Sequence, residues 1–157
     1  MRRPRLDAAF LLGVVLMLGL AWWLKGDPPP GLPGEPDLSP YQGAPLLLVY
    51  GAPGCAACLV QWRTLEHSLP ADLRVLHLAA RASKTDTRPA DADTARRWAA
   101  SLGVAPAAVL PADLPQRTLP ALVLRDVRGR WRFEHAGALD DAARTRLDRA
   151  LRSEGVE

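Results

Sequence analysis

The order of hydrophobic and polar positions predicts an α/β domain in which strands and helices alternate before a final hairpin and helix. Short apolar runs bounded by turn residues are typical of strands, whereas apolar residues spaced by three or four positions indicate helices. The predicted strands cover residues 46–50, 74–79, 121–125 and 130–135. The predicted helices begin near Cys55, at Asp91 or Asp93, and at Asp140. This order implies a mixed central sheet with helices on both faces.

Two stretches carry further expectations. In the strand over residues 130–135, strict alternation places Trp131 and Phe133 on one face of the sheet. We expect the arginines of this hairpin to form a solvated, charged edge that blocks aggregation; they are Arg125, Arg128, Arg130 and Arg132. Residues 104–117 are rich in Pro and Ala, and they predict no more than a short helix at their centre.

Residues 8–24 form an uncharged apolar run of 17 residues, near the short end of a membrane-spanning helix. Three arginines lie in the flank over residues 1–7, and the single Lys25 follows the run. By the positive-inside rule, this difference in positive charge places the N-terminus in the cytoplasm. We therefore expect a single-pass anchor in a bacterial inner membrane, with the C-terminal domain in the periplasm. A secretory signal cleaved after Gly19-Leu20-Ala21 is the alternative, and it delivers the domain to the same compartment.

A Pro-rich linker over residues 25–45 separates this anchor from the folded part. It contains seven prolines and four glycines, a composition typical of an extended, semi-rigid spacer and not of a packed element. We therefore expect the folded domain to cover residues 46–157.

The formal net charge of +3 comes entirely from the flanks of the apolar run. Residues 1–25 hold four Lys or Arg and one Asp, whereas residues 26–157 hold 16 charges of each sign. A nucleic-acid-binding protein needs its positive excess on the folded surface. The charge pattern therefore excludes nucleic acid as a partner.

The chain has two cysteines, Cys55 and Cys58, at the predicted start of a helix. This spacing allows a small disulfide ring, and the helix N-terminus stabilises a thiolate at Cys55. We predict a catalytic dithiol in which Cys55 is the nucleophile and the more buried Cys58 resolves the mixed disulfide. A structural disulfide and a metal site are the alternatives. No second cysteine pair or paired-histidine motif completes a metal site, so we expect no metal and no cofactor.

The sequence around the cysteines resembles the thioredoxin family. Residues 46–58, LLLVYGAPGCAAC, are similar to the strand and active-site turn of thioredoxins. Leu119-Pro120 stands where thioredoxin-like proteins carry a cis-proline facing the cysteines, Gly129 falls in the following hairpin turn, and Gly137-Ala138-Leu139 is similar to the family's ending. The resemblance covers about residues 44–153, and it implies a thioredoxin-like fold preceded by one transmembrane helix.

By this resemblance, Pro120 lies against Cys55, and the backbone of Leu119 binds an extended substrate segment beside the turn at Pro53 and Gly54. The implied activity is thiol–disulfide exchange with periplasmic protein thiols and disulfides. We favour a reductase, because tethered thioredoxin-like proteins are often reductants. A membrane electron-transfer partner would then recycle the chain. The alternatives are a disulfide oxidase or isomerase, and a non-enzymatic metal-binding or scaffold module with the same fold.

The sequence also departs from the thioredoxin pattern. Val49 occupies the strand position where thioredoxins usually have a buried acidic residue, so proton transfer at Cys58 needs another route, such as water or Glu66. Gly54 replaces the tryptophan before the first cysteine, which leaves the direction of electron flow open. For the three histidines we expect surface or half-buried structural roles; they are His67, His77 and His135.

Overall fold

The computed structural model describes residues 17, 34–83, 85–86, 88–113 and 118–156. The predicted membrane anchor and the flank before it lie outside this part, apart from Met17. Among the described residues, no helix is both long enough and apolar enough to cross a bilayer.

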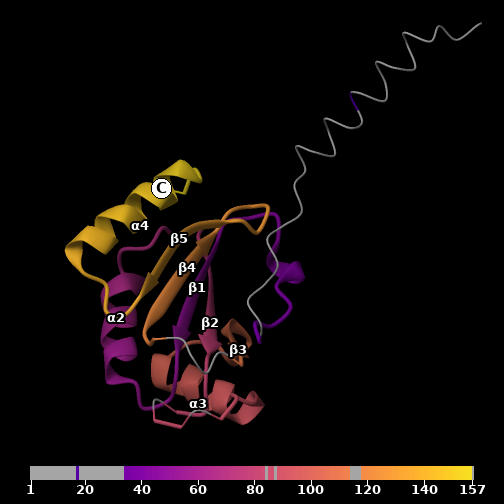
Figure 1. Cartoon of the computed structure of the whole chain (residues 1–157), viewed down its shortest axis with the longest axis vertical. Helices are drawn as coiled ribbons and strands as arrows, with labels where there is room; N and C mark the ends of the chain where they lie inside the picture. Colours follow the sequence, from indigo (N-terminus) through magenta and orange to yellow (C-terminus); the bar gives the residue numbers. More distant parts are fainter. Residues whose placement is uncertain (1–16, 18–33, 84, 87, 114–117, 157) are drawn as a thin grey trace, which may run out of the picture.

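A five-stranded mixed sheet forms the centre of the domain, in the order β3-β2-β1-β4-β5 (Figure 1). The pairs β1–β2 and β2–β3 are parallel, whereas β1–β4 and β4–β5 are antiparallel. The strands are β1 Leu46–Gly51, β2 Arg74–Ala79, β3 Val109–Pro111, β4 Ala121–Arg125 and β5 Trp131–Ala136. Four of them confirm the strands predicted from hydrophobic runs.

Strand β3 was not predicted. The expected short helix within residues 104–117 is the 3-10 turn η2, Pro106–Ala108, and the chain then enters β3 directly. The register pairs His77 with Val109 along the open edge of β2. A three-residue strand ending in proline has little strand signal of its own, because its stability comes from the neighbouring edge.

Three α-helices follow the predicted pattern: α2 Ala56–Glu66, α3 Ala92–Leu102 and α4 Asp141–Ser153. Asp91 caps α3 by accepting a hydrogen bond from the backbone N–H of Thr94, and Asp140 caps α4 in the same way through Ala143. Such side chains satisfy amide groups that the first turn leaves without partners. The predicted start positions at Asp91 and Asp140 are therefore confirmed.

The expectation of helices on both faces is wrong for the described residues. Trp62 of α2 and Leu147 of α4 pack against one face of the sheet, which we call the helix face; its central side chains are Leu47, Val49, Leu122 and Leu124. Trp98 of α3 packs with Ala79, which strand alternation places on the same face. Two consecutive right-handed parallel crossovers in one direction keep their helices on one side of a sheet.

The opposite face is covered in part by the segment before β1. We call it the N-terminal face; its core side chains include Leu46, Leu48, Tyr50, Leu78 and Val123. Leu38 and Tyr41, beside and within the 3-10 turn η1 Ser39–Tyr41, pack against it. Figure 1 shows this segment in indigo on the side away from α2 and α4. The described part of the Pro-rich linker, residues 34–45, is thus packed on the domain and is not only a spacer.

The β4–β5 hairpin differs from strict alternation. A bulge between Leu124 and Arg125 shifts the register, so that Leu124 pairs with Phe133 and Arg125 pairs with Trp131. Phe133 therefore packs on the helix face, whereas Trp131 packs on the N-terminal face. The prediction that these two aromatic residues share a face is wrong, because a bulge inserts one residue and reverses the side-chain direction.

The hairpin arginines are also not a uniform solvated edge. Arg125 is 7 % exposed, and its guanidinium pairs with the carboxylate of Glu35. Arg130 remains half exposed and pairs with Asp126 in the hairpin turn. Arg125 lies beside the bulge. The expected solvent exposure is confirmed for the other three arginines of the hairpin and is wrong for Arg125.

Candidate active site

The cysteine pair lies in the turn that leaves β1. Ala52 after the strand is fully buried, and its carbonyl accepts a hydrogen bond from the backbone N–H of Cys55 at 3.1 Å. Pro53 is half-buried and Gly54 is exposed. Gly54 has a backbone φ of +77°, a conformation that residues other than glycine rarely adopt. This glycine therefore allows the tight turn into α2.

Cys55 is the N-cap residue of α2 and forms a disulfide with Cys58, with Cα atoms 5.3 Å apart. The backbone N–H of Cys58 donates to Cys55 Sγ at 3.3 Å. After reduction the same N–H and the positive end of the helix dipole face the Cys55 sulfur, and they stabilise its negative charge. The predicted position of Cys55 at the helix start is confirmed.

Both sulfur-bearing residues are buried in the disulfide form. Cys55 is 0 % exposed and Cys58 is 4 % exposed, so Cys55 is not the more exposed of the two. Ala90, which precedes α3, and Leu119 pack against the same cluster. An incoming sulfur must therefore displace neighbouring side chains before it reaches either cysteine.

Leu119 and Pro120 bring the predicted proline loop to the site. The Leu119–Pro120 peptide bond is cis, as the resemblance implied. Leu119 packs against the cysteine cluster, while Pro120 is buried and its carbonyl accepts a hydrogen bond from Gly137 N–H at 2.8 Å. The loop before α4 and the proline loop thus lie side by side, and the role of Leu119 and Pro120 in substrate binding stays a prediction.

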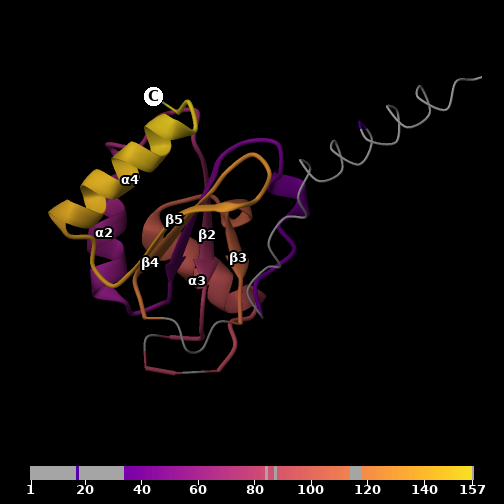
Figure 2. The same cartoon turned by 45° about the horizontal axis from the view of Figure 1, so that its top comes forward.

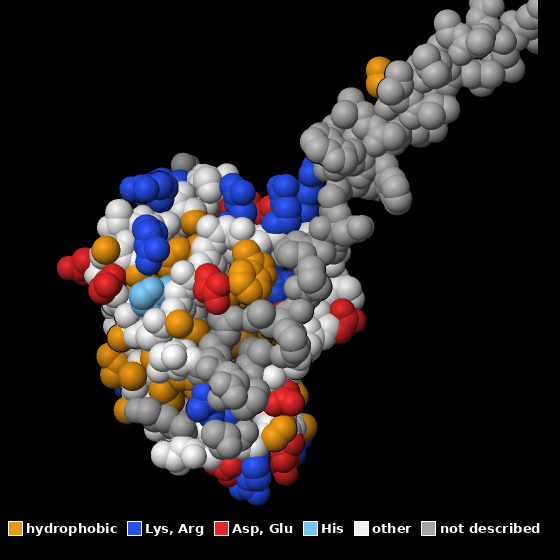
Figure 3. Space-filling model, in the orientation of Figure 1, with side chains coloured by type: hydrophobic (Ala, Val, Ile, Leu, Met, Phe, Trp, Pro, Cys, Tyr) orange, Lys and Arg blue, Asp and Glu red, His pale blue; other side chains and the backbone are white. Residues whose placement is uncertain are grey.

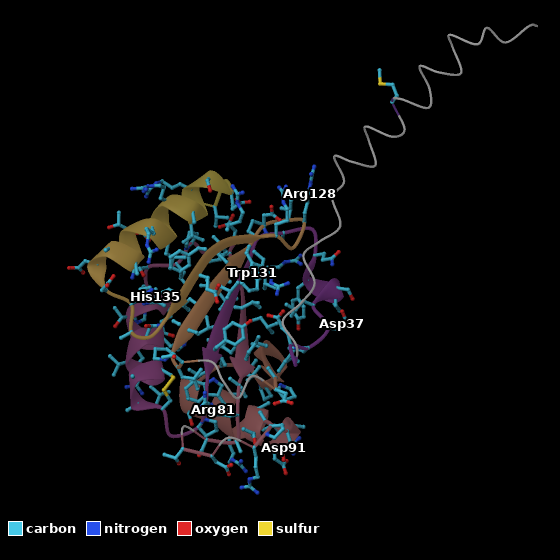
Figure 4. All side chains as sticks on the ribbon, in the orientation of Figure 1. Asp37, Arg81, Asp91, Arg128, Trp131 and His135 are labelled. Atoms are coloured by element: carbon cyan, nitrogen blue, oxygen red, sulfur yellow. A yellow bond between two sulfur atoms is a disulfide. The ribbon has the colours of Figure 1, made fainter. Side chains whose placement is uncertain are left out.

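The site lies at the end of the sheet that also carries the loop after β2. The backbone N–H of Ala80 donates to the carbonyl of Gly51 at 2.8 Å, which joins the ends of β1 and β2. Figure 4 shows the disulfide in yellow at the same end of the domain as Arg81 and Asp91. Figure 2 shows the loop after β2 at this end, below the strands.

His77 is buried near the site. The sequence analysis expected it to be at the surface or half-buried. It lies on β2 beside Val49 and is 2 % exposed. Its ring meets the indole of Trp62 edge-on with centroids 4.3 Å apart, and its Nδ1 has no hydrogen-bond partner among the described residues. Burial lowers the pKa of His77 to about 4, so the imidazole is neutral near pH 7.

Glu66 does not supply the missing proton route suggested by the sequence. It is the last residue of α2, eight positions after Cys58, and lies 3.6 Å from His67 Nε2. Eight residues of α-helix span about 12 Å, which is too far for direct proton transfer to Cys58. Within the described part of the chain, no group of three or more His, Cys, Asp and Glu side chains could hold a metal ion.

Gln61 was also missed by sequence reasoning. It is 8 % exposed, and its Oε1 accepts a hydrogen bond from the backbone N–H of Leu139 at 2.8 Å. This contact joins α2, which carries the cysteines, to the loop before α4. A single glutamine within a helical pattern gives no signal for such a contact, because its partner lies 78 positions away.

Comparison of the sequence with protein-family models and with curated proteins finds no match. Among solved structures, the fold is similar to a thioredoxin-like protein in the oxidized form, with a TM-score of 0.54 at 19 % identity. That match covers 78 % of this chain and 88 % of the other. It is also similar to a proposed protein disulfide isomerase from Bacteroides thetaiotaomicron, with a TM-score of 0.50 at 16 % identity, covering 74 % and 77 % of the two chains. The chain thus has a thioredoxin-like fold with a Cys-x-x-Cys disulfide at the start of α2.

Proposed function

We propose that the chain is a thiol–disulfide oxidoreductase acting on protein thiols and disulfides, with Cys55 as nucleophile and Cys58 as resolving thiol. One observation carries this proposal: the Cys55–Cys58 disulfide forms at the N-terminus of α2, with the Cys58 N–H directed at Cys55 Sγ. A thioredoxin-like fold with this pair supports thiol–disulfide exchange. A structural disulfide is less favoured, because so small a loop constrains the unfolded chain little.

The reaction in the reducing direction has two steps. The Cys55 thiolate attacks one sulfur of a substrate disulfide, and the first substrate sulfur leaves as a thiolate that takes a proton from water. Cys58 then loses its proton to water, and its thiolate attacks Cys55 Sγ, which releases the second substrate sulfur. The substrate gains two electrons and two protons, and the cysteine pair is oxidised to the disulfide seen here.

We further propose that the domain works in the periplasm as a reductase, anchored by residues 8–24 to the inner membrane and recycled by a membrane electron-transfer partner. The apolar run and the arginines before it support the anchor and its orientation. An oxidase or isomerase is the alternative, since a glycine before Cys55 and two alanines between the cysteines leave the redox poise undetermined.

Two experiments test this function. In a Cys58→Ser variant, mixed disulfides between Cys55 and client proteins should accumulate, whereas Cys55→Ser should trap none. The equilibrium reduction potential, measured in glutathione and dithiothreitol buffers, should be about −270 mV for a reductase and about −120 mV for an oxidase. A pair that stays oxidised across the accessible range, with no trapped clients, would rule out the catalytic function.

A further inference from the structure

A groove of about 290 Å³ runs along α2 beside the cysteine pair, between this helix and the start of α4. Its lining begins at Ala57, the second of the two exposed alanines between the cysteines, and continues through Val60 and Gln61. The opposite wall is formed by Leu139 and the first residues of α4. The groove thus begins beside the reactive pair, and neither Leu119 nor Pro120 lines it.

The floor of this groove is apolar and open to solvent. Val60 is 66 % exposed, and apart from Met17 only Val127 shares this status among the large hydrophobic side chains of the described residues. Figure 3 shows hydrophobic side chains in orange over α2 on this side of the molecule. An isolated exposed valine needs no explanation, but one that lines a groove next to a reactive disulfide offers a contact for an apolar side chain.

Gln61 adds a buried amide nitrogen to the lining of the groove. Its Oε1 is used by the Leu139 N–H, whereas its buried Nε2 has no hydrogen-bond partner among the described residues. An unpaired buried amide donor is unfavourable, and a ligand carbonyl in the groove would satisfy it.

Two aspartates without ion-pair partners in the described residues make the rim of the groove negatively charged. Asp140 and Asp141 are exposed at the start of α4, and neither takes part in an ion pair within the described residues. Arg144 also lines the groove, but its guanidinium is directed to Asp148 at 3.2 Å and to the hydroxyl of Ser68. Figure 3 shows acidic side chains in red over this end of α4.

The geometry points to a docking groove for an extended segment of the redox partner, in which an apolar side chain rests on Val60 and an adjacent lysine or arginine faces Asp140 and Asp141. A backbone carbonyl of the segment accepts a hydrogen bond from Gln61 Nε2. This inference rests on the proposed function and adds the kind of sequence that the site prefers. The charge complementarity with the two aspartates identifies the occupant as basic rather than acidic.

The spacing predicts where these residues stand in the partner. Val60 follows Cys55 by five residues, a rise of about 7.5 Å along α2. An extended chain covers that distance in about two residues. The apolar and basic residues should therefore lie two to three positions from the reacting cysteine of the partner.

Synthetic peptides test this preference directly. The full-length chain, reduced and held in detergent micelles, is mixed with disulfide-linked dimers of a Cys-Ser-Leu-Lys peptide or a Cys-Ser-Leu-Glu peptide, and with hydroxyethyl disulfide. We expect the lysine peptide to react about threefold faster than the glutamate peptide, the size of effect that exposed charge pairs produce. Asp141→Lys should reverse this order, because the new lysine repels the lysine peptide and attracts the glutamate peptide.

A control variant with the same change of charge far from the groove distinguishes a local contact at Asp141 from an effect of the protein's net charge. Asp72→Lys makes the same substitution on an exposed residue before β2 and should leave the peptide order unchanged. Equal rates for the two peptides, an order that Asp141→Lys does not alter, or an order that Asp72→Lys alters equally would each overturn the inference. Failure of the unaltered chain to reduce hydroxyethyl disulfide would instead contradict the proposed function.

Discussion

Glu35 and Arg125 form an ion pair across 90 positions of sequence, with only 2 % and 8 % of their side chains exposed. The hydroxyl of Tyr50 also donates a hydrogen bond to the Glu35 carboxylate. Glu35 belongs to the Pro-rich linker, and its two partners belong to β4 and β1 of the sheet. The contact therefore fixes the end of the linker to the N-terminal face of the domain.

Removing this carboxylate should destabilise the domain. Glu35→Gln leaves Arg125 buried without its counter-charge, and losing one partner of a buried pair costs about 3–5 kcal/mol. Urea unfolding followed by circular dichroism should show the loss as a lower midpoint with the same slope. Asp72→Asn, on an exposed residue, is the control and should change the free energy of unfolding little. A Glu35→Gln midpoint equal to the control would contradict the structural role.

Removing the whole segment should have a larger effect. A fragment over residues 46–157 lacks Leu38 and Tyr41, which pack on the N-terminal face, and it lacks Glu35 as well. Compared with a fragment over residues 34–157, it should unfold at lower urea and bind a hydrophobic dye more strongly, because apolar side chains of the sheet become exposed. Identical unfolding curves and dye binding for the two fragments would show that the domain begins at residue 46.

His77 should make the stability depend on pH in the acid range. Its pKa is about 4 in the folded chain because it is buried, compared with 6.5 for an unperturbed histidine. The unfolded chain therefore binds a proton more readily between these values, so stability is full above about pH 6.5 and falls as the pH drops towards 4. The contribution lost is about 3 kcal/mol.

This dependence is measured by urea unfolding at a series of pH values. His77→Leu should remove most of the slope between pH 6.5 and 4, leaving only the part that the carboxylates cause. His67→Gln is the matched control, since the side chain of His67 is 85 % exposed. The assignment to His77 fails if the His77→Leu and unaltered chains show the same slope.

Gly51 should not tolerate a side chain. A Cβ added there would lie 2.4 Å from Cζ2 of Trp98, whose ring is rigid and 1 % exposed. Gly51→Ala should therefore destabilise the domain by about 1–3 kcal/mol through overpacking. Combining it with Trp98→Leu should remove most of this additional cost relative to Trp98→Leu alone. Equal costs in both backgrounds would show that the two residues do not interact.

Local chemistry in the sequence predicted many of the elements that build the site. The apolar run over residues 46–50, the aspartates at 91 and 140 and the cysteine pair all act on residues within one turn or one strand. Each of these features is therefore visible in the order of amino acids. The cis-proline loop was predicted through the family resemblance and not through local chemistry, because the peptide geometry depends on its surroundings.

The sequence by itself determined where the helices begin, which apolar runs become strands and that the two cysteines meet at a helix start. Tertiary structure alone decided that the helices share one face, that the bulge at Leu124 and Arg125 separates Trp131 from Phe133, and that Glu35 returns to Arg125. It also decided that Cys55 and His77 are buried. These features depend on contacts between residues far apart in the chain. The energies of such contacts cannot be predicted from the local pattern of side chains.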